Sequence, residues 1–252
     1  MLSKAKLKLI QSLEHKKKRR EERLFVAEGP KVVGDLLPYL TCRLIVATPT
    51  WIAKNPQIKT DELIEVTSDE LRKASFLKTP QDVLALFELP TSTADPSIAT
   101  RELCLALDDV QDPGNLGTII RLADWFGIRH IFCSIGTTDA FSPKTVQASM
   151  GAVARVCVHY VPLTEFLSSV HTIQPATPIY GTFLEGNNIY KEPLSTHGII
   201  IMGNEGNGIS AAIKSSVTHK LFIPNYPEGC ATSESLNVAI ATAITCSEFR
   251  RR

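Results

Sequence analysis

The feature that most constrains the fold is a regular alternation of short apolar runs and amphipathic segments over residues 96–252. Runs such as 198–202 have the length and composition of a strand that is buried on both faces. This alternation is typical of a parallel sheet with helices on both faces, so an α/β fold is predicted. The expected strands are 103–107, 129–134, 154–160, 178–183, 198–202 and 219–223, and the expected helices are 115–126, 143–149, 163–170, 209–216 and 234–248.

The chain before residue 96 alternates less regularly and predicts a smaller α/β domain. Its first ~25 residues are expected to be helical, because Leu7, Ile10 and Leu13 are spaced by three in Lys- and Glu-rich surroundings. The other expected elements are strands 24–28, 43–48 and 83–87, a turn at 29–30, and helices 31–37 and 68–74.

A linker is predicted at residues 90–100, which are rich in Pro, Thr and Ser and have no periodicity. We therefore predict a boundary near residue 95 and two domains, 1–95 and 96–252. Hydrophobic residues make up 44% of the chain and charged residues 21%, which is typical of globular proteins, so a core is expected.

Basic residues are concentrated at the N-terminus, although the formal net charge is only +1. Residues 1–23 hold nine Lys or Arg and three Glu. A basic arm of this kind predicts a polyanion partner such as RNA, and a solvated, charged helix face explains the same pattern without a partner. The candidate RNA-binding residues are Lys16, Lys17, Lys18, Arg19, Arg20 and Arg23.

The sequence lacks the signals of membrane, secreted and metal-binding proteins. No apolar run reaches the ~18–20 residues that a membrane span needs, and the N-terminus has no apolar signal-peptide region. The six cysteines include no C-x-x-C pair, and the six histidines have no metal-ligand spacing. We expect a cytoplasmic protein with reduced thiols, no membrane association and no metal site.

The first of three polar loops at strand–helix boundaries follows the expected strand 103–107. The Asp-Pro-Gly sequence at 112–114 turns the chain, and Asn115 is expected to cap the next helix. Arg121 lies about 140° round that helix from the apolar Leu116, at ~100° per residue. It therefore points away from the buried stripe, where it could bind a phosphate or could be an ordinary surface arginine.

The second loop, GNEGNG at 203–208, follows the apolar run 198–202. Gly203 and Gly206 would let the backbone approach a ligand or another backbone segment closely. The spacing G-x-x-G-x-G differs from the dinucleotide fingerprint G-x-G-x-x-G, and no Gly-Lys-Ser/Thr of a P-loop ends the loop. Glu205 places a carboxylate near a helix N-terminus, where helix capping explains it equally well.

The third loop begins at Ile223 and Pro224 and leads into the last expected helix. Either Ser233 or Ser235 could cap this helix. Ser235 and Asn237 would then lie in its first turn, where backbone N–H groups have no intrahelical partner.

Together and in this order, the three loops resemble the motifs of the SpoU (TrmH-like) branch of the SPOUT RNA methyltransferases. That family transfers a methyl group from S-adenosyl-L-methionine to a ribose 2′-hydroxyl of RNA. The resemblance implies a C-terminal trefoil knot and a homodimer formed through the catalytic domain. The link between Pro224 and Ser235 is longer than the family's usual Gly-containing link, and Gly229 is the candidate for its glycine.

The segment 24–31, LFVAEGPK, with the basic helix before it, resembles the small RNA-binding domain related to ribosomal L30e that precedes many SpoU catalytic domains. The expected substrate is therefore 23S ribosomal RNA or else transfer RNA, with ribosomal RNA favoured.

The resemblance also implies roles for individual residues. The implied catalytic residues are Asn115, Arg121, Glu205, Ser235 and Asn237. The implied cofactor-binding residues are Thr182, Gly203, Asn204, Gly206, Ile223, Pro224 and Leu236. A guanidinium is always protonated in proteins, so Arg121 is expected to hold a phosphate and stabilise alkoxide charge instead of acting as a base. Asn115 and Glu205 are expected to orient it.

Other functions remain open at this stage. A non-catalytic RNA-binding protein acting in ribosome assembly is the main alternative, although it would have no reason to keep all five implied catalytic residues. A base methyltransferase could use Cys230 as a nucleophile. A dinucleotide-binding oxidoreductase fits the alternation but lacks the glycine fingerprint.

Overall fold

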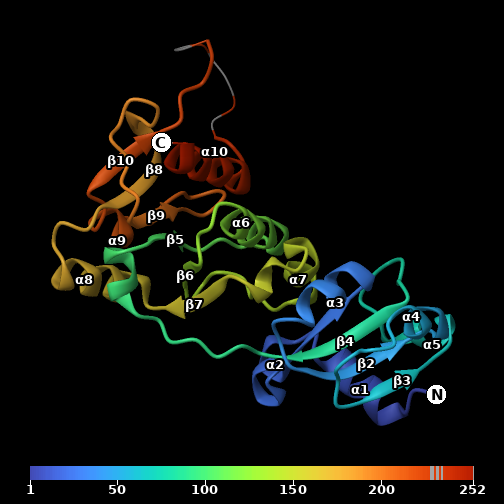
Figure 1. The fold of residues 1–252 in the computed structure, drawn as a ribbon. Coiled ribbons are helices and arrows are strands. Elements are labelled where there is room, and N and C mark those ends of the chain that lie inside the picture. Colours follow the sequence, from blue (N-terminus) through green and yellow to red (C-terminus); the bar gives the residue numbers. More distant parts are fainter. Residues whose placement is uncertain (228–229, 231–232, 234, 252) are drawn as a thin grey trace. The chain divides into compact units, whose positions relative to one another are not determined.

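The computed structural model describes residues 1–227, 230, 233 and 235–251. Contacts within the chain divide it into two compact units, which Figure 1 draws in sequence colours. Unit 1 is Met1–Thr91 with Asp139–Arg155, and unit 2 is Ser92–Thr138 with Val156–Arg252. The assignment of an RNA-binding domain to 1–95 and a catalytic domain to 96–252 stays a prediction.

Unit 1 is built on a four-stranded mixed sheet in the order β1-β4-β2-β3. The central strand β4 is antiparallel to β1 and β2, whereas β2 and β3 are parallel. The strands are β1 (Leu24–Glu28), β2 (Cys42–Ala47), β3 (Leu63–Glu65) and β4 (Val83–Glu88).

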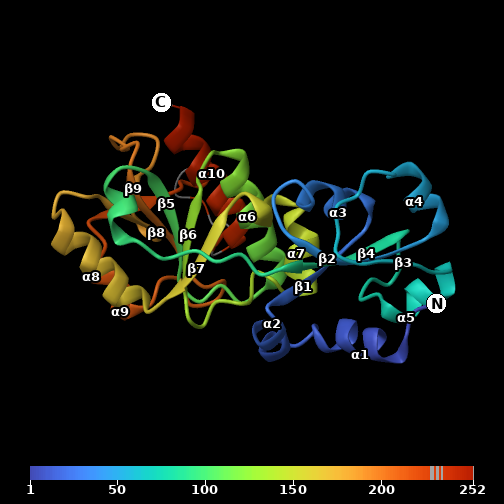
Figure 2. The ribbon, with the colours of Figure 1, turned by 60° about the horizontal axis from the view of Figure 1, so that its bottom comes forward.

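Helices cover both faces of this sheet, as Figure 2 shows. Ile10 and Leu13 pack with Leu71 and Ala74 against alternate residues of the strands, and these contacts form one core. The helices are α1 (Lys4–Ser12), α2 (Lys16–Glu22), α3 (Pro30–Leu36), α4 (Pro49–Lys54), α5 (Ser68–Ala74) and α7 (Pro143–Ser149), with the 3-10 turn η2 (Ala152–Ala154).

The first ~25 residues are mostly helical, as expected, and form two helices. Ser3 caps α1 by accepting a hydrogen bond from the Lys6 N–H, and a turn separates α1 from α2. Arg23 then ends α2 in the left-handed conformation, with φ 56°. The prediction also missed the short elements α4 and β3.

The segment Asp139–Arg155, which is remote in sequence, packs within unit 1. Its helix α7 contacts β1, and its turn η2 contacts α3. The Phe141 and Phe25 rings lie 5.0 Å apart between centroids. The Arg19 guanidinium, almost fully buried, pairs with the Asp139 carboxylate at 2.5 Å. A buried ion pair and an aromatic contact therefore hold this segment against the N-terminal residues.

Unit 2 contains the parallel sheet that the alternation predicts, with six strands in the order β10-β8-β9-β5-β6-β7. Every strand pair is parallel. The strands are β5 (Leu103–Leu107), β6 (His130–Ser134), β7 (Cys157–Val161), β8 (Ile179–Asn188), β9 (Gly198–Met202) and β10 (His219–Phe222).

Two layers of helices enclose this sheet. Figures 1 and 2 show α6 and α10 side by side on one face, and the two helices pack on each other. On the other face Leu163, Phe166, Leu167 and Ile213 pack against strand residues in an apolar core. The helices are α6 (Pro113–Trp125), α8 (Leu163–Ile173), α9 (Ala211–Lys214) and α10 (Val238–Arg251), with the 3-10 turn η1 (Pro96–Thr100).

The α/β prediction is confirmed, and the differences lie mostly at element ends. Helix α10 begins four residues later than expected, and η1 occupies part of the expected structureless linker. The trefoil knot implied by the family resemblance stays a prediction.

The order in which the strands are added to the sheet changes direction between the neighbouring strands β5 and β9. From β5 the chain proceeds to β6 and β7 on one side, and β9, β8 and β10 lie on the other. Open α/β sheets place ligands outside the carboxyl ends of the strands at such a reversal. Within the described part of the chain, no helix is long and apolar enough to cross a membrane.

Candidate active site

The three polar loops follow the carboxyl ends of β5, β9 and β10 in unit 2. Strands β5 and β9 are direct neighbours, and the Asp108 N–H donates to the Met202 carbonyl at 2.9 Å where both strands end. The first two loops therefore leave the sheet side by side, at the reversal in strand order.

The first loop turns into α6 at Asp112, not at Asn115 as predicted. The Asp112 carboxylate accepts a hydrogen bond from the Asn115 N–H at 2.8 Å, which makes Asp112 the N-cap. Pro113 takes the first helical position, which suits its fixed φ and missing N–H. Asn115 consequently lies in the first turn, and its side-chain amide is available for other contacts.

The second loop is closed by its own backbone. Asn204 and Gly208 exchange backbone hydrogen bonds of 3.0 Å, and the Asn204 carboxamide oxygen accepts from the Gly206 and Asn207 N–H groups at 2.9 and 3.0 Å. A side chain at Gly203 would place its Cβ 2.2 Å from the Gly208 carbonyl carbon. Gly203 is therefore required by close approach of another backbone segment, one of the two reasons that the sequence offered.

Glu205 joins the second loop to the first. Its carboxylate accepts hydrogen bonds from the backbone N–H groups of Gln111 and Asp112, both at 3.2 Å. It also accepts from the Asn115 side-chain amide at 3.1 Å. Asn204 adds a further bond to the first loop, from its amide to the Asp109 carbonyl at 2.7 Å.

These donors set the charge state of Glu205. Burial alone would raise the pKa of its carboxyl, but the hydrogen bonds from Asn115 and from the backbone outweigh this effect and lower the pKa. The side chain is nevertheless exposed, so the carboxylate remains accessible to solvent. Glu205 is an ionised anchor at neutral pH.

The third loop meets the same cluster through Asn237. The Asn237 amide donates to the Asn115 carboxamide oxygen at 3.0 Å. Its own carboxamide oxygen accepts from the Ala239 and Ile240 N–H groups at 2.9 and 3.3 Å, so it caps α10. A continuous chain of hydrogen bonds, Glu205–Asn115–Asn237, thus links all three loops.

The predicted serine caps of α10 are wrong, because Asn237 fills that position. Ser235 is exposed just before the cap, and its hydroxyl makes no hydrogen bond with any residue in the described ranges. Ser233 is likewise exposed. The candidate glycine of the long link, Gly229, lies outside the described residues.

Arg121 lies on the exposed side of α6, as its angle from Leu116 predicts. Thr118 and Trp125 share that side because they are three and four residues away. Across the described part of the chain, Arg121 makes no hydrogen bond or ion pair. The expected orienting contacts from Asn115 and Glu205 are absent there, since those two side chains bond to each other and the loop backbones. Its guanidinium is free to bind an external anion.

The predicted cofactor residues belong to the second and third loops, except for Thr182, which lies on β8. Ile223 and Pro224 are half-buried, and the apolar Leu236 is 48% exposed. The Thr182 hydroxyl on β8 donates to the Ile201 carbonyl at 3.3 Å, so its role in the structure is to join two strands. A Cβ at Gly206 would make an ordinary contact with the Asn204 Oδ1 at 3.7 Å, so the glycine is not required by space.

The basic arm of unit 1 is less uniform than its sequence suggests. Arg19 is 2% exposed and donates to the Leu13 and Glu14 carbonyls as well as to Asp139, so it is a structural residue and not a phosphate contact. The exposed predicted residues are Lys17, Lys18, Arg20 and Arg23, and Lys16 is half-buried.

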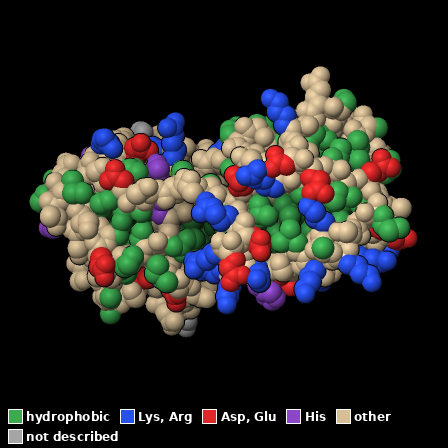
Figure 3. Space-filling model, turned by 90° about the horizontal axis from the view of Figure 1, so that it is seen from below, with side chains coloured by type: hydrophobic (Ala, Val, Ile, Leu, Met, Phe, Trp, Pro, Cys, Tyr) green, Lys and Arg blue, Asp and Glu red, His purple; other side chains and the backbone are tan. Residues whose placement is uncertain are grey.

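Acidic neighbours compensate part of the charge of this arm. Lys18 pairs with Glu21 at 2.7 Å, and the Lys17 ammonium lies 3.9 Å from the same carboxylate. Figure 3 shows a similar mixture on one face of the molecule, where Lys and Arg side chains are interspersed with Asp and Glu. Neighbouring charges of opposite sign weaken each other's field, so the attraction of the arm for a polyanion is smaller than its count of cations suggests.

Two residues of the first loop were not recognised from the sequence. Asp109 adopts a left-handed conformation with φ 61°, which is uncommon outside glycine, and its carboxylate accepts from the Gln111 amide at 2.7 Å. Gln111 also donates to the Gly136 carbonyl at 2.9 Å. The Asp-Asp pair after a strand was the available signal, because Asp tolerates left-handed backbone.

Comparison with known proteins agrees with this geometry. A model described as the SpoU rRNA Methylase family matches residues 102–247, and one described as the MRM3-like substrate binding domain matches residues 4–85. The 23S rRNA (guanosine(2553)-2'-O)-methyltransferase RlmP of Bacillus subtilis (strain 168) is 32% identical over 248 residues, which cover 97% of this chain and 96% of that protein.

Two solved structures resemble the whole chain. A TrmH-family protein from Porphyromonas gingivalis has 42% identity and a TM-score of 0.89, and the match covers 100% of this chain and 99% of that one. An rRNA methyltransferase from Sinorhizobium meliloti, solved with AdoMet bound, has 32% identity and a TM-score of 0.83, with 100% and 96% covered. The match to a SpoU model over most of unit 2 and the full-length relatives lead to one conclusion: this chain belongs to the SpoU rRNA methylase family.

Proposed function

We propose that the protein transfers a methyl group from S-adenosyl-L-methionine to a ribose 2′-hydroxyl of 23S ribosomal RNA. The observation that carries this proposal is the Glu205–Asn115–Asn237 hydrogen-bond chain, which joins the three family motifs at the carboxyl ends of parallel strands. The relative from Bacillus subtilis, similar over almost the whole chain, is named for this reaction on 23S rRNA.

The residues around the second and third loops fit the cofactor. Leu236 is exposed and Ile223 and Pro224 are half-buried, so apolar surface lies open where an adenine ring would cover it. When bound, S-adenosyl-L-methionine supplies the electrophilic methyl group.

Arg121 provides the positive charge of the site. It is exposed on α6, about two turns from Asn115. We assign it to the phosphate next to the target ribose, which fixes the 2′-oxygen and stabilises negative charge as that oxygen loses its proton. Water or the phosphate accepts the proton. Ser235, whose hydroxyl makes no hydrogen bond among the described residues, positions the ribose.

The same proposal extends to partners and location. We assign a homodimer through unit 2, because the packed helices α6 and α10 expose Trp125 (83%) and Ile240 (52%), which is apolar surface of the kind that subunit interfaces cover. Trp125→Glu is expected to shift the sedimentation coefficient toward that of a monomer.

The N-terminal domain 1–95 supplies RNA affinity, and the protein works in the cytoplasm.

The decisive experiment is methylation of unmodified 23S rRNA and tRNA by the purified full chain with radiolabelled cofactor. Ribose 2′-O-methyl nucleosides mapped by mass spectrometry in 23S rRNA are expected. Methylation only in tRNA would change the substrate, and a methylated base would change the reaction. If calorimetry shows no cofactor binding at millimolar concentration, the protein is a non-catalytic RNA-binding relative and the proposal is wrong.

A further inference from the structure

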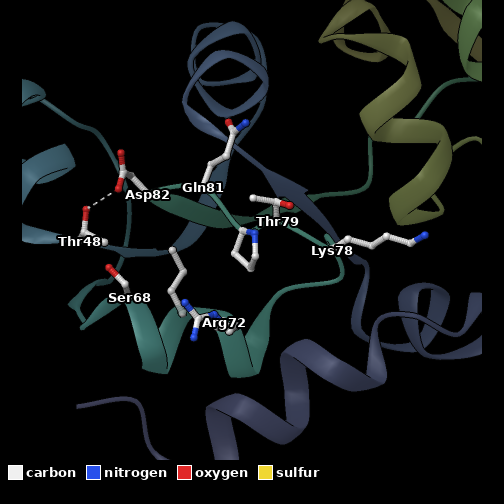
Figure 4. Close-up of a pocket in the computed structure, with 9 residues that line it drawn as sticks. Thr48, Ser68, Arg72, Lys78, Thr79, Gln81 and Asp82 are labelled. Carbon is white, nitrogen blue, oxygen red and sulfur yellow. Dashed lines mark hydrogen bonds between the residues drawn. The ribbon is translucent and has the colours of Figure 1, made fainter.

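Unit 1 contains a cavity at the edge where β2 ends and β4 begins, outside the site described above. Its volume is about 230 Å³, and Figure 4 shows the residues that line it. The lining residues used below are Thr48, Ser68, Leu71, Arg72, Pro80 and Asp82.

The cavity has an apolar wall and a fixed acceptor. Leu71 lines the cavity but is only 3% exposed, so the half-buried Pro80 offers most of the apolar surface on which a flat ring can pack. The Thr48 hydroxyl, from a residue only 5% exposed, donates to the Asp82 Oδ1 at 3.3 Å. The Thr48 N–H also donates to the Asp82 carbonyl at 2.9 Å, so backbone and side chain of Asp82 are both held in place.

The remaining polar groups of the cavity have hydrogen-bonding capacity to spare. Within the described ranges, the Asp82 Oδ2 and the Ser68 hydroxyl make no hydrogen bond. The Arg72 Nη1 donates to Asp69 in an exposed pair at 3.1 Å, and its Nε and Nη2 have no partner in the part of the chain that the structure describes. Exposed pairs of this kind contribute little, so Arg72 can exchange Asp69 for another anion. In Figure 4 the Lys78 side chain extends away from the other lining residues.

This combination selects a class of ligand. A carboxylate with a free oxygen accepts two parallel N–H bonds, and guanine is the RNA base whose Watson–Crick edge presents two adjacent N–H donors, N1–H and N2–H. The guanidinium of Arg72 suits a phosphate. Proteins read RNA sequence mainly from unstacked bases in single-stranded segments, which a pocket of this size can accommodate.

We propose that this cavity binds one unstacked guanosine nucleotide of the RNA substrate, with the base edge on Asp82, the ring on Leu71 and Pro80, and the phosphate on Arg72. The proposal rests on the proposed function, because it takes RNA as the substrate. In this proposal the cavity recognises a specific nucleotide, and the basic arm attracts RNA of any sequence.

The first test is a titration of the full ¹⁵N-labelled chain with guanosine 5′-monophosphate, followed by NMR. The amide resonances of Thr48, Ser68 and Asp82 are expected to shift, and adenosine 5′-monophosphate is expected to shift them much less. Asp82→Asn keeps the size of the side chain but faces the guanine donors with an amide, so the preference for guanine should disappear. Equal shifts with both nucleotides, or none at millimolar concentration, would overturn the proposal.

The second test separates this cavity from the reaction itself. Arg72→Ala is expected to raise KM for RNA several-fold without changing kcat or cofactor affinity. Lys73→Ala is the matched control, because Lys73 is an exposed cation on the same helix that does not line the cavity, and it should change KM far less. If both variants methylate RNA with the native KM, the cavity proposal fails and the proposed function stands. If guanosine monophosphate binds at the cavity but the native chain methylates no RNA, the proposed function fails and the cavity assignment survives.

Discussion

Replacing Glu205 by Gln is expected to uncouple the first two loops of the active site. The carboxylate accepts three N–H donors, from the Gln111 and Asp112 backbone and the Asn115 amide. Glutamine has a single acceptor oxygen. If it keeps the Asp112 and Asn115 bonds that share Oε1, its NH₂ group must face the Gln111 N–H, which loses its partner.

The expected loss in the free energy of unfolding follows from the number of these hydrogen bonds. A hydrogen bond to a charged group contributes roughly 1.5–3 kcal/mol and one to a neutral group roughly 0.5–1.5 kcal/mol. Because Glu205 is exposed, water compensates much of the loss, and we expect the free energy of unfolding to fall by about 1–2 kcal/mol in total. An equal loss of transition-state stabilisation would reduce kcat/KM on the order of 10-fold.

The assay is urea unfolding with single-turnover methylation of 23S rRNA, and Glu185→Gln is the control. Glu185 is an exposed glutamate of the same unit whose side chain makes no hydrogen bond among the described residues. The pKa of Glu205 is lowered, so its contribution to stability is full above the usual value of 4.5 and is lost as pH falls through the lower folded pKa. In the Glu205→Gln variant, the decrease in stability that protonation of Glu205 causes at low pH should be absent. Native stability and native rates in the variant would refute the anchoring role.

Three further predictions concern single residues of unit 2. Arg121→Ala should lower the single-turnover rate on the order of 10²–10³-fold and Arg121→Lys less, with cofactor affinity unchanged; native rates in the alanine variant would make Arg121 an ordinary surface residue. Burial, with the nearby His130, lowers the pKa of His159 from 6.5 to about 4, so stability should be full above pH 6.5 and fall toward pH 4. The free energy of unfolding should fall by about 3 kcal/mol over this range, at about 1.4 kcal/mol per pKa unit. In urea unfolding at different pH values, His159→Phe should make it less dependent on pH between 6.5 and 4. Asp109 has φ 61°, so Asp109→Val should be about 1–2 kcal/mol less stable than Asp109→Gly, because both variants lose the bond to Gln111 and only valine is strained; equal melting temperatures for the two variants would argue against backbone strain.

The sheet of unit 2 was predictable because its strands are buried on both faces. Every residue of β5 and β9 is buried, and such continuous apolar runs stand out between polar segments. The helix ends were less predictable, because several residues could serve as caps. Asp112 and Asn115 are both good N-caps; Asp112 caps α6, and the Asn115 side chain bonds to Glu205 of another loop instead.

The hydrogen bonds of the site could be predicted only in part. The resemblance pointed to Asn115, Glu205 and Asn237 as a group, but the bonds among them cross 90 and 122 residues of sequence. No local pattern carries information on such distant pairs. The same holds for Arg19, which stands in a run of basic residues but is buried and pairs with Asp139, 120 residues away.

The position of Asp139–Arg155 changes how the basic arm must be tested. This segment connects β6 to β7 of the parallel sheet, yet its own contacts lie within unit 1, through Phe141 on Phe25 and the Arg19 ion pair. Deleting residues 1–95 would expose the aromatic face of this segment and leave the Asp139 carboxylate without its cation, which is costly for a buried pair. A loss of RNA affinity in such a deletion would therefore report damage to a connection within the catalytic sheet as well as the missing arm.

Charge removal at Lys17 and Arg20, both exposed, leaves these packing interactions intact and tests the arm by itself. Each RNA phosphate that the arm no longer neutralises should reduce the slope of log affinity against log salt by about 0.7–0.9, because fewer counterions are released on binding. The measurement is filter binding of the full-length double alanine variant to 23S rRNA over a range of salt concentrations. An unchanged slope would assign the arm to a solvated helix face, and the RNA affinity of unit 1 would then have to come from other surfaces.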